Sequence, residues 1–518
     1  MYQPTNNDNN ASSIAEEKIG HHGTPSLSNY LQDVTGTSKK EHTARGEESF
    51  SEEKTRAEKK LVCKLDIRIM ILLCLWRIGT RYDGTNVLPN AKIVGIVSDL
   101  HMTDAQYRWC LTAPFIAFLI LSIPLNLLLR KWRPALMVGA LSLVWGSVTM
   151  VTPAVTNFPG LLISQIIIGI FSTANNAVLV YYIALWYRRC ESAQRFGWTQ
   201  IAANIGSCVS GLVALGATEI PATSTMNAWK WMFVIFAIPS VATGILCLLF
   251  LPDEPETSKV LNNQERELAV ERLASEQAYT DIHSWSWSQV LSVLTDWKLY
   301  WFLLFYLTAN ITLGGARLNL PSIIKSMGDW NEQITLALTA PTFIVSCIFT
   351  YVLSWLSDKY QQRAYFIVLT DLISALGALM VMFIPEQQVG ARYFAVCIYK
   401  AAVDAAEPIR NAWIAECFSG LSRRAVAAGF LFMGDAAGNA IAGQSFFDPP
   451  RYLMGYTIGL ASLAVNIISI LVFRWILYRV NKNRDEIVQN EEKSKQQIIK
   501  YGGDKFVGDR HPRYRYSL

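Results

Sequence analysis

Charge is scarce in this chain and unevenly distributed along it. Asp, Glu, Lys and Arg make up 17% of the 518 residues, whereas soluble domains carry about 25%. Polar residues gather in three stretches, 1–66, 252–296 and 480–518, and long apolar runs fill the two blocks between them. This distribution excludes a disordered chain and a string of soluble domains. A polytopic membrane protein remains.

Signatures of enzymes, metal sites and nucleic-acid binding are also missing. The sequence has no Walker A motif, which would indicate ATP-driven pumping, and no GxSxG, HExxH or paired-histidine cluster. The cysteines show neither CxxC spacing nor a framework of loop pairs, and no basic patch interleaves with aromatic residues. We therefore expect no catalytic activity, no cofactor, no metal and no nucleic-acid partner.

Twelve stretches are apolar enough to cross a bilayer, which takes about 20 mostly apolar residues in a helix. In the first half they are 67–88, 108–129, 135–153, 160–185, 197–218 and 231–251. In the second half they are 298–322, 333–356, 364–384, 391–415, 424–444 and 454–478. We predict an all-α membrane protein with twelve transmembrane helices in two six-helix halves.

The basic residues of the short loops set the predicted orientation. With both termini in the cytosol, the inner loops carry ten Lys or Arg residues and the outer loops four to six, as the positive-inside rule requires. The N-terminal tail has no apolar signal-peptide core, and its polar composition indicates disorder. The predicted organisation is a cytosolic tail (1–66), an N-terminal half (67–251), a cytosolic central loop (252–297), a C-terminal half (298–478) and a second cytosolic tail (479–518).

Several short motifs occur in a characteristic order. They are Asp83-Gly84-Thr85-Asn86, Leu185-Trp186-Tyr187-Arg188-Arg189, Leu251-Pro252-Asp253-Glu254-Pro255, Trp355-Leu356-Ser357-Asp358-Lys359 and the ending at 508–516. The 6+6 layout is typical of the parallel repeats of the major facilitator fold. Together these features resemble the fungal allantoate permease family of the major facilitator superfamily, which includes nicotinate, pantothenate and allantoate carriers. The resemblance implies secondary transport of a small organic anion by alternating access, commonly driven by protons.

One position departs from the pattern of that family. Its members usually carry an acidic residue in helix 4 after Gly-x-Phe, but Gly169-Ile170-Phe171 is followed here by Ser172. Either another acid carries the proton, or the protein is an uncoupled facilitator or exchanger. A non-transporting nutrient sensor is a third alternative. The expected partners are a small-molecule substrate, the lipid bilayer and protons, and the expected form is a monomer in the plasma membrane.

Cationic side chains inside apolar helices predict contact with a carboxylate. An ionisable residue at the membrane centre costs about 2.5–3.5 kcal/mol and so needs a reason. Arg77 and Arg81 are four residues apart and share a helix face, and Arg317 lies seven residues after Asn310 on nearly one face. Guanidinium groups bind carboxylates by bidentate hydrogen bonds, although Arg81 alternatively pairs at the outer interface. Amides that bond either to substrate or to a neighbouring helix are Asn175, Asn176, Gln200, Asn204 and Asn310.

The predicted tenth helix holds the densest group of charges. Lys400, Asp404, Glu407 and Asn411 are spaced by 4, 3 and 4 residues and therefore lie on one stripe of a helix. One interpretation is a self-neutralising ladder, with Lys400 paired to Asp404 and Glu407 paired to Arg410. The other is that Asp404 or Glu407 takes over the proton from the missing acid of helix 4.

Other interior charges and the inner loops give less specific signals. Asp83 and Asp435 are further candidates for proton coupling, whereas Asp371 is expected to be structural. The interior holds five basic and five acidic residues, so the count alone does not predict an anionic substrate. Trp76 and Tyr82 are candidates for stacking on a ring substrate. Gating contacts in the inner loops are expected from Arg130, Lys131, Arg133, Asp358, Lys359 and Arg363.

Overall fold

The chain divides into two compact units, Met1–Cys63 and Lys64–Leu518. A computed structural model describes residues 56–84, 87–129, 133–220, 226–256, 258, 260–277, 293–418, 421–489 and 514–516. In the first unit, residues 56–63 are described, and they are helical. All other described helices belong to the second unit.

Helices make up the first half of the second unit. The transmembrane candidates there are α2, α5, α6, α7, α8 and α9, and short helices lie between them. In chain order the elements are η1 (Asp66–Met70), α2 (Ile71–Gly84), α3 (Val87–Ile93), α4 (Ile96–Asp99), α5 (Asp104–Leu129), α6 (Pro134–Val151), η2 (Thr152–Ala154), α7 (Phe158–Trp186), α8 (Arg189–Thr218) and α9 (Ala228–Phe250).

The second half repeats this arrangement after a helix of the central loop, α10 (Asn263–Gln277). Its long helices are α12, α15, α16, α17, α18 and α19. In chain order the elements are α12 (Trp297–Leu318), α13 (Leu320–Lys325), α14 (Glu332–Ala337), α15 (Thr339–Tyr360), α16 (Arg363–Phe383), α17 (Val389–Cys417), α18 (Leu421–Ser445) and α19 (Leu453–Gln489).

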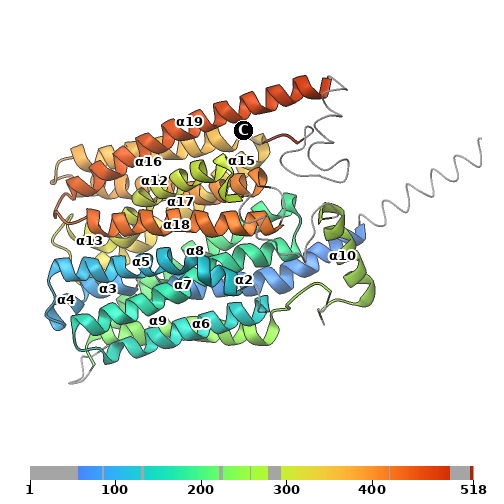
Figure 1. The fold of residues 1–518 in the computed structure, drawn as a ribbon. Coiled ribbons are helices and arrows are strands. Elements are labelled where there is room, and N and C mark those ends of the chain that lie inside the picture. Colours follow the sequence, from blue (N-terminus) through green and yellow to red (C-terminus); the bar gives the residue numbers. More distant parts are fainter. Residues whose placement is uncertain are drawn as a thin grey trace, which may run out of the picture. The chain divides into compact units, whose positions relative to one another are not determined.

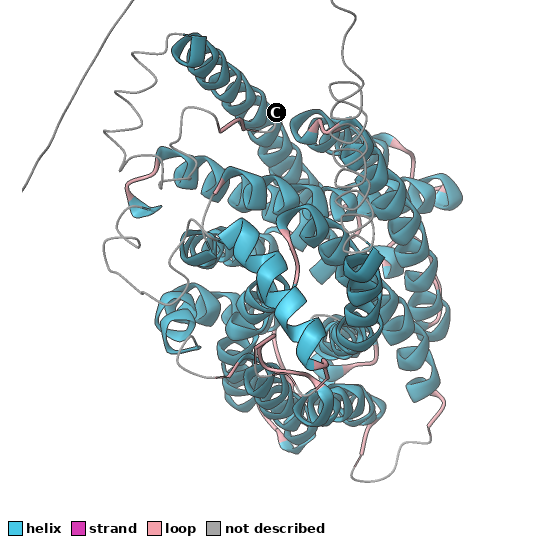
Figure 2. Cartoon of the chain, turned by 90° about the vertical axis from the view of Figure 1, so that its right-hand side faces the viewer, coloured by secondary structure: helices cyan, strands magenta, loops and turns pink. Residues whose placement is uncertain are grey.

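The all-α prediction is confirmed, because helices cover all twelve expected ranges and the described residues form no β-strand (Figure 2). Within the described residues, seven helices are long and apolar enough to cross a membrane. Large apolar side chains such as Ile120, Phe250 and Phe383 are exposed on the outside of the helices. In a bilayer these side chains face lipid, and the helical backbone bonds to itself because the hydrocarbon offers no water. The full count of twelve crossings stays a prediction.

The most extensive contacts between the halves are those of α5 with α18, which lie side by side in Figure 1, and of α8 with α15. α5 and α15 are the second long helices of their halves, and α8 and α18 are the fifth. The pairing is therefore reciprocal, as two related repeats require. A Cβ atom on Gly443 of α18 would lie 2.9 Å from the Oγ1 atom of Thr112 in α5, and one on Gly211 of α8 would collide with Thr339 of α15. Small residues thus allow both pairs to approach closely.

The halves meet at the end of the bundle where α3 contacts α13, which we call the α3–α13 end. There Gln444 Nε2 donates a hydrogen bond of 2.9 Å to Thr112 Oγ1, and Gln333 donates one to Glu219. This end is extracellular in the predicted orientation. The described contacts therefore close the bundle on that side.

Ion pairs hold the opposite end of the N-terminal half. Arg195 of α8 binds Asp66 of η1 through two hydrogen bonds, Nη2 to Oδ2 at 2.7 Å and Nε to Oδ1 at 3.1 Å. From α10, Arg272 contributes an ion pair of 3.2 Å with Glu191 of α8. The central loop is thereby docked onto the N-terminal half.

Candidate substrate-binding cavity

A cavity of about 110 Å³ lies between the two halves. Its lining comes from α2, α5, α6, α7 and α8 on one side and from α12, α17 and α18 on the other. Of the predicted substrate residues, the cavity brings together Arg77, Gln200, Asn310 and Arg317. Two predicted acids, Glu407 and Asp435, also line it.

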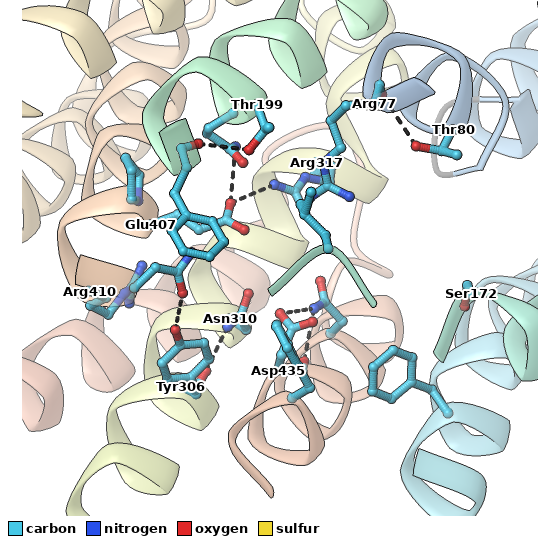
Figure 3. A pocket seen from close by; sticks show the side chains of 18 of the residues that line it. Arg77, Thr80, Ser172, Thr199, Tyr306, Asn310, Arg317, Glu407, Arg410 and Asp435 are labelled. Atoms are coloured by element: carbon cyan, nitrogen blue, oxygen red, sulfur yellow. Dashed lines mark hydrogen bonds and ion pairs between the residues drawn. The ribbon is translucent and has the colours of Figure 1, made fainter. Parts of the chain in front are cut away.

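Glu407 is the centre of the polar contacts in this cavity (Figure 3). Its Oε2 atom lies 3.3 Å from Nη2 of Arg317 in α12 and accepts a hydrogen bond of 3.2 Å from Nε2 of Gln200 in α8. Pro408 follows Glu407 inside α17, and an internal proline removes a backbone hydrogen bond from a helix. One carboxylate thus connects three helices from both halves.

Arg77 is buried in the N-terminal half and interacts with the charged groups of the C-terminal half. Its side chain is 8% exposed, and it interacts electrostatically with Glu407, Arg317 and Asp435. Figure 3 shows its guanidinium group next to that of Arg317. Thr80, one helical turn further on, donates its hydroxyl to the backbone oxygen of Arg77 at 3.3 Å.

The C-terminal wall contains further polar groups around Glu407. Tyr306 donates its hydroxyl to Asn411, and Asn310 donates its amide to the backbone oxygen of Tyr306 at 2.9 Å. Asp435 accepts a hydrogen bond of 3.1 Å from Asn439 in the same helix. Tyr306, Asn310 and Asp435 thus each make a hydrogen bond within the C-terminal half, while the Oδ1 atom of Asn310 is buried without a hydrogen-bond partner.

Aromatic residues form much of the remaining lining. Phe115 and Phe118 come from α5, Trp145 from α6, Phe196 from α8 and Phe432 from α18. The sequence did not reveal Phe115, Phe118 and Trp145, because α5 and α6 are mostly apolar on all sides and no periodicity distinguishes a cavity face from a lipid face. Spacing alone offered no signal for these rings.

Trp76 contradicts its predicted role in stacking. It is completely buried, does not line the cavity, and donates its indole N–H to Ser142 of α6. The buried hydroxyl satisfies the indole donor, so Trp76 packs α2 against α6. Ser142 in turn donates to the backbone oxygen of Val138 at 2.9 Å.

Of the two ion pairs predicted within α17, the pair Lys400–Asp404 is correct and the pair Glu407–Arg410 is wrong. Lys400 and Asp404 form a buried ion pair, and the Lys400 ammonium lies 4.7 Å from the centre of the Phe343 ring. Neither side chain lines the cavity. Glu407, however, is paired with Arg317 of another helix rather than with Arg410. Side chains facing a cavity meet partners from across it, which helical spacing does not reveal.

Several predicted residues lie elsewhere. Asn204 is buried outside the cavity lining, and Asp371 accepts a hydrogen bond of 2.8 Å from Asn466 of α19, as its structural role requires. Ser172 lines the cavity and donates to the backbone oxygen of Gly169 at 2.9 Å. Residues that belong to described helices but whose side chains lie outside the described part are Arg81, Tyr82, Asp83, Asn175 and Asn176.

The inner-loop charges make contacts within the C-terminal half. Arg363 donates to the carboxylate of Asp358 and lies 2.9 Å from Oε1 of Glu416 in α17. The Lys359 ammonium lies 5.0 Å from the centre of the Trp355 ring. Arg133 is exposed at the start of α6, whereas Arg130 and Lys131 lie outside the described residues.

Comparison with known proteins identifies the class to which this helical bundle belongs. The family model of the Major Facilitator Superfamily matches residues 73–331 and 315–506, and the chain belongs to this superfamily. It is thus a multi-pass membrane transport protein and not an enzyme.

Individual relatives agree with this assignment. The MFS transporter prlL of a fungal species is 28% identical over 89% of this chain and 91% of its own length. The high-affinity nicotinic acid transporter of Saccharomyces cerevisiae is 26% identical over 89% of this chain and 85% of its own. The xylose transporter XylE from E. coli, solved in a partially occluded inward open conformation, superposes with a TM-score of 0.63 at 16% identity, over 79% of this chain and 97% of XylE. The fold prediction is confirmed.

Proposed function

We propose that the protein is a secondary active transporter of a small organic acid carrying one negative charge, working by alternating access. The charge of the cavity lining carries this proposal. Among the described lining residues, three are cationic, Arg77, Arg317 and Arg410, and two are anionic, Glu407 and Asp435. An uncompensated charge in a low-dielectric cavity is costly. A bound carboxylate offsets the cationic excess, which is one charge while Glu407 is ionised and two charges once Glu407 is protonated.

The aromatic lining supports a substrate with a flat or apolar body. Phe115, Phe118 and Trp145 present ring surface from the N-terminal half, and aromatic pairs gain about 0.5–1.5 kcal/mol beyond the burial of area. A relative named as a transporter of nicotinic acid handles a molecule of this kind, a ring bearing one carboxylate. Nicotinate is therefore the first probe to use.

Proton coupling in this proposal works through competition for Arg317. Glu407 is paired with Arg317 at 3.3 Å, so an ionised Glu407 and a substrate carboxylate need the same guanidinium. A proton on Glu407 releases Arg317 for the substrate. The groups that face Glu407 are Arg77 of α2, Gln200 of α8, Tyr306 and Arg317 of α12, Arg410 of α17 itself and Asp435 of α18.

In this mechanism the acid sits on α17, and Ser172 on α7 needs no charge. Asp404 is a weaker candidate for the proton carrier, because it is buried against Lys400 outside the cavity lining. The contacts at the α3–α13 end suggest a cavity that exchanges substrate at the opposite, cytosolic end in this state. Opening the α3–α13 end would then complete the cycle.

Uptake into liposomes containing the purified protein tests the proposal. With an inward proton gradient, radiolabelled nicotinate is expected to accumulate above its external concentration, and a protonophore is expected to abolish the accumulation. Nicotinamide has the same ring without the charge and is the matched control, which should neither enter nor compete. Saturable nicotinamide uptake equal to that of nicotinate would contradict an anion-selective cavity.

The second candidate is a facilitator or exchanger without proton coupling, which Ser172 favours because the family's usual helix 4 acid is absent. In that case nicotinate equilibrates but does not accumulate, with or without the protonophore. The same experiment therefore separates the two candidates.

A further inference from the structure

The last described residues of the chain, 514–516, lie against the ends of three helices in the C-terminal half. They contact the start of α12, the end of α17 and the last turns of α19. α19 has 37 residues and is about 55 Å long at 1.5 Å per residue, against a hydrocarbon core of about 30 Å. Its final turns extend past the neighbouring helices and provide the docking surface (Figure 1).

The backbone of Tyr516 is held from both sides by one amide. Its N–H donates to Oδ1 of Asn481 at 3.0 Å, and its carbonyl oxygen accepts from Nδ2 of Asn481 at 2.9 Å. Two residues earlier, the carbonyl oxygen of Tyr514 accepts from Nη1 of Arg484 at 2.9 Å. Paired bonds of this kind fix the register of the segment on α19.

The Tyr516 ring fills a site made by two cations and an apolar cluster. The side chain is 7% exposed and packs in the same cluster as Phe418. The Lys298 ammonium lies 4.8 Å from the ring centre and the Arg484 guanidinium 4.7 Å from it, and Lys298 also donates to the hydroxyl at 3.2 Å. Cations over an aromatic ring contribute about 0.5–2 kcal/mol each. The site is thus suited to a tyrosine.

The same segment reaches the inner-loop charges. Tyr514 donates its hydroxyl to the backbone oxygen of Glu416, and the Glu416 carboxylate accepts from Arg363 at 2.9 Å. Arg363 begins α16 and also binds Asp358 at the end of α15. The segment 514–516 is therefore connected, through Glu416 and Arg363, to the junction of α15 and α16.

We propose that these helix ends form a binding site for a peptide with two tyrosines separated by one residue, and that the chain's own residues 514–516 occupy it as a latch. The docked latch fastens α12, α17 and α19 into one block and supports the Glu416–Arg363 contact at the α15–α16 junction. It touches one half only in these contacts. Its loss is therefore expected to loosen that block without changing the substrate cavity.

Hydrogen–deuterium exchange on the full chain in detergent or liposomes tests the latch. In the wild type, the Tyr516 amide is expected to be protected. The variants Asn481→Ala and Tyr516→Ala should each raise exchange at residues 514–516 and at residues 357–363 by about tenfold, the effect of losing one or two hydrogen bonds. Because each variant releases the same segment, 514–516, from the helix ends, the double variant should exchange no faster than either single variant.

The matched control is Arg515→Ala, which removes a cation from the same segment. Arg515 pairs with Asp485 at 2.7 Å, and the two side chains are 34% and 59% exposed, so exchange should stay at the wild-type level. A synthetic peptide of residues 511–518, added to the Tyr516→Ala chain, should restore protection at 357–363, whereas a scrambled peptide should not. Free exchange of the Tyr516 amide in the wild type, or unchanged exchange at 357–363 in both variants, would overturn the proposal.

Discussion

The N-terminal wall of the cavity carries one described charge, Arg77, and most of the aromatic rings, whereas the C-terminal wall carries Arg317, Arg410, Glu407 and Asp435. The first wall comes from α2, α5, α6, α7 and α8, of which α5, α6 and α7 are mostly apolar along their length. The second comes from α12, α17 and α18. The contrast separates two tasks of a carrier, since shape selects the body of a substrate and charge binds its carboxylate.

The charged wall is also where a proton can change the structure. Glu407 connects Arg317 of its own half to Gln200 of the other half, so neutralising this one carboxylate weakens contacts on both sides. The aromatic rings of the N-terminal wall do not take up a proton and so cannot respond in this way. Substitutions on the C-terminal wall are therefore expected to affect coupling and rate, and those on the N-terminal wall to affect affinity.

The largest effect is expected from Arg317→Ala. It removes the guanidinium that we propose for the carboxylate and leaves Glu407 without that partner, and hydrogen bonds to charged groups contribute about 1.5–3 kcal/mol each. Nicotinate uptake should fall by roughly a hundredfold, measured as initial rate at equal surface expression. Arg451→Ala is the matched control, because that guanidinium is about half exposed, pairs with Glu386 and lies outside the cavity lining. Equal losses in both variants would contradict a specific role for Arg317.

Glu407→Gln should separate binding from coupling. The neutral side chain imitates the protonated acid, so nicotinate should still bind and exchange across the membrane, but accumulation in a proton gradient should disappear and the dependence of uptake on pH should flatten. Uptake measured between about pH 5 and pH 8 tests this, and wild-type uptake is expected to fall as the pH rises. Asp435→Asn, on the same wall, should retain the pH dependence. The reverse outcome would move the proton to Asp435.

Phe118→Ala tests the aromatic wall. Loss of one ring contact of about 1–1.5 kcal/mol should raise the KM for nicotinate and benzoate by roughly fivefold to tenfold, and leave the KM of an aliphatic acid such as hexanoate unchanged. Phe394→Ala is the matched control, because its ring is exposed on the outside of α17. If hexanoate and benzoate lose affinity equally, the wall contributes volume and not ring recognition.

The smallest effect is expected outside the cavity, at the ion pair between Lys64 and Glu265 of α10. The Lys64 ammonium donates to Glu265 at 2.6 Å and holds the pKa of that carboxyl below its ordinary value. The contact therefore stabilises the fold above that ordinary value and is lost as the pH falls through the lowered one. Both partners are about one-third exposed, and such pairs contribute about 0–1 kcal/mol. Glu265→Gln should lower Tm by roughly 1–2 °C at pH 7, and by less at pH 4.

The fold followed from the sequence because its strongest signal is local. Each apolar run of about 20 residues specifies a helix regardless of its neighbours. The family model confirms the Major Facilitator Superfamily, whereas the resemblance to the allantoate permease family stays a prediction. The pair Lys400–Asp404 was equally predictable, since both residues lie on one face of one helix, four residues apart.

The cavity was predictable only in part, because its contacts join distant segments. Glu407 and Arg317 are 90 residues apart, and spacing within α17 pointed instead to Arg410. Phe115 and Phe118 carry no signal within an apolar helix, whereas Trp76, an obvious aromatic candidate, packs against Ser142. Only the packing of helices decides which residues of an apolar helix face a cavity and which face lipid.

Proton movement during nicotinate entry tests the central claim most directly. Liposomes containing the protein and an internal pH dye are exposed to nicotinate with no imposed gradient, and internal acidification is followed together with radiolabel uptake. We expect the wild type to acidify the lumen as nicotinate enters, and Glu407→Gln to exchange nicotinate without acidification. Nicotinate entry that leaves the wild-type lumen at constant pH, or equal acidification by Glu407→Gln, would contradict competition between a protonatable Glu407 and the substrate for Arg317.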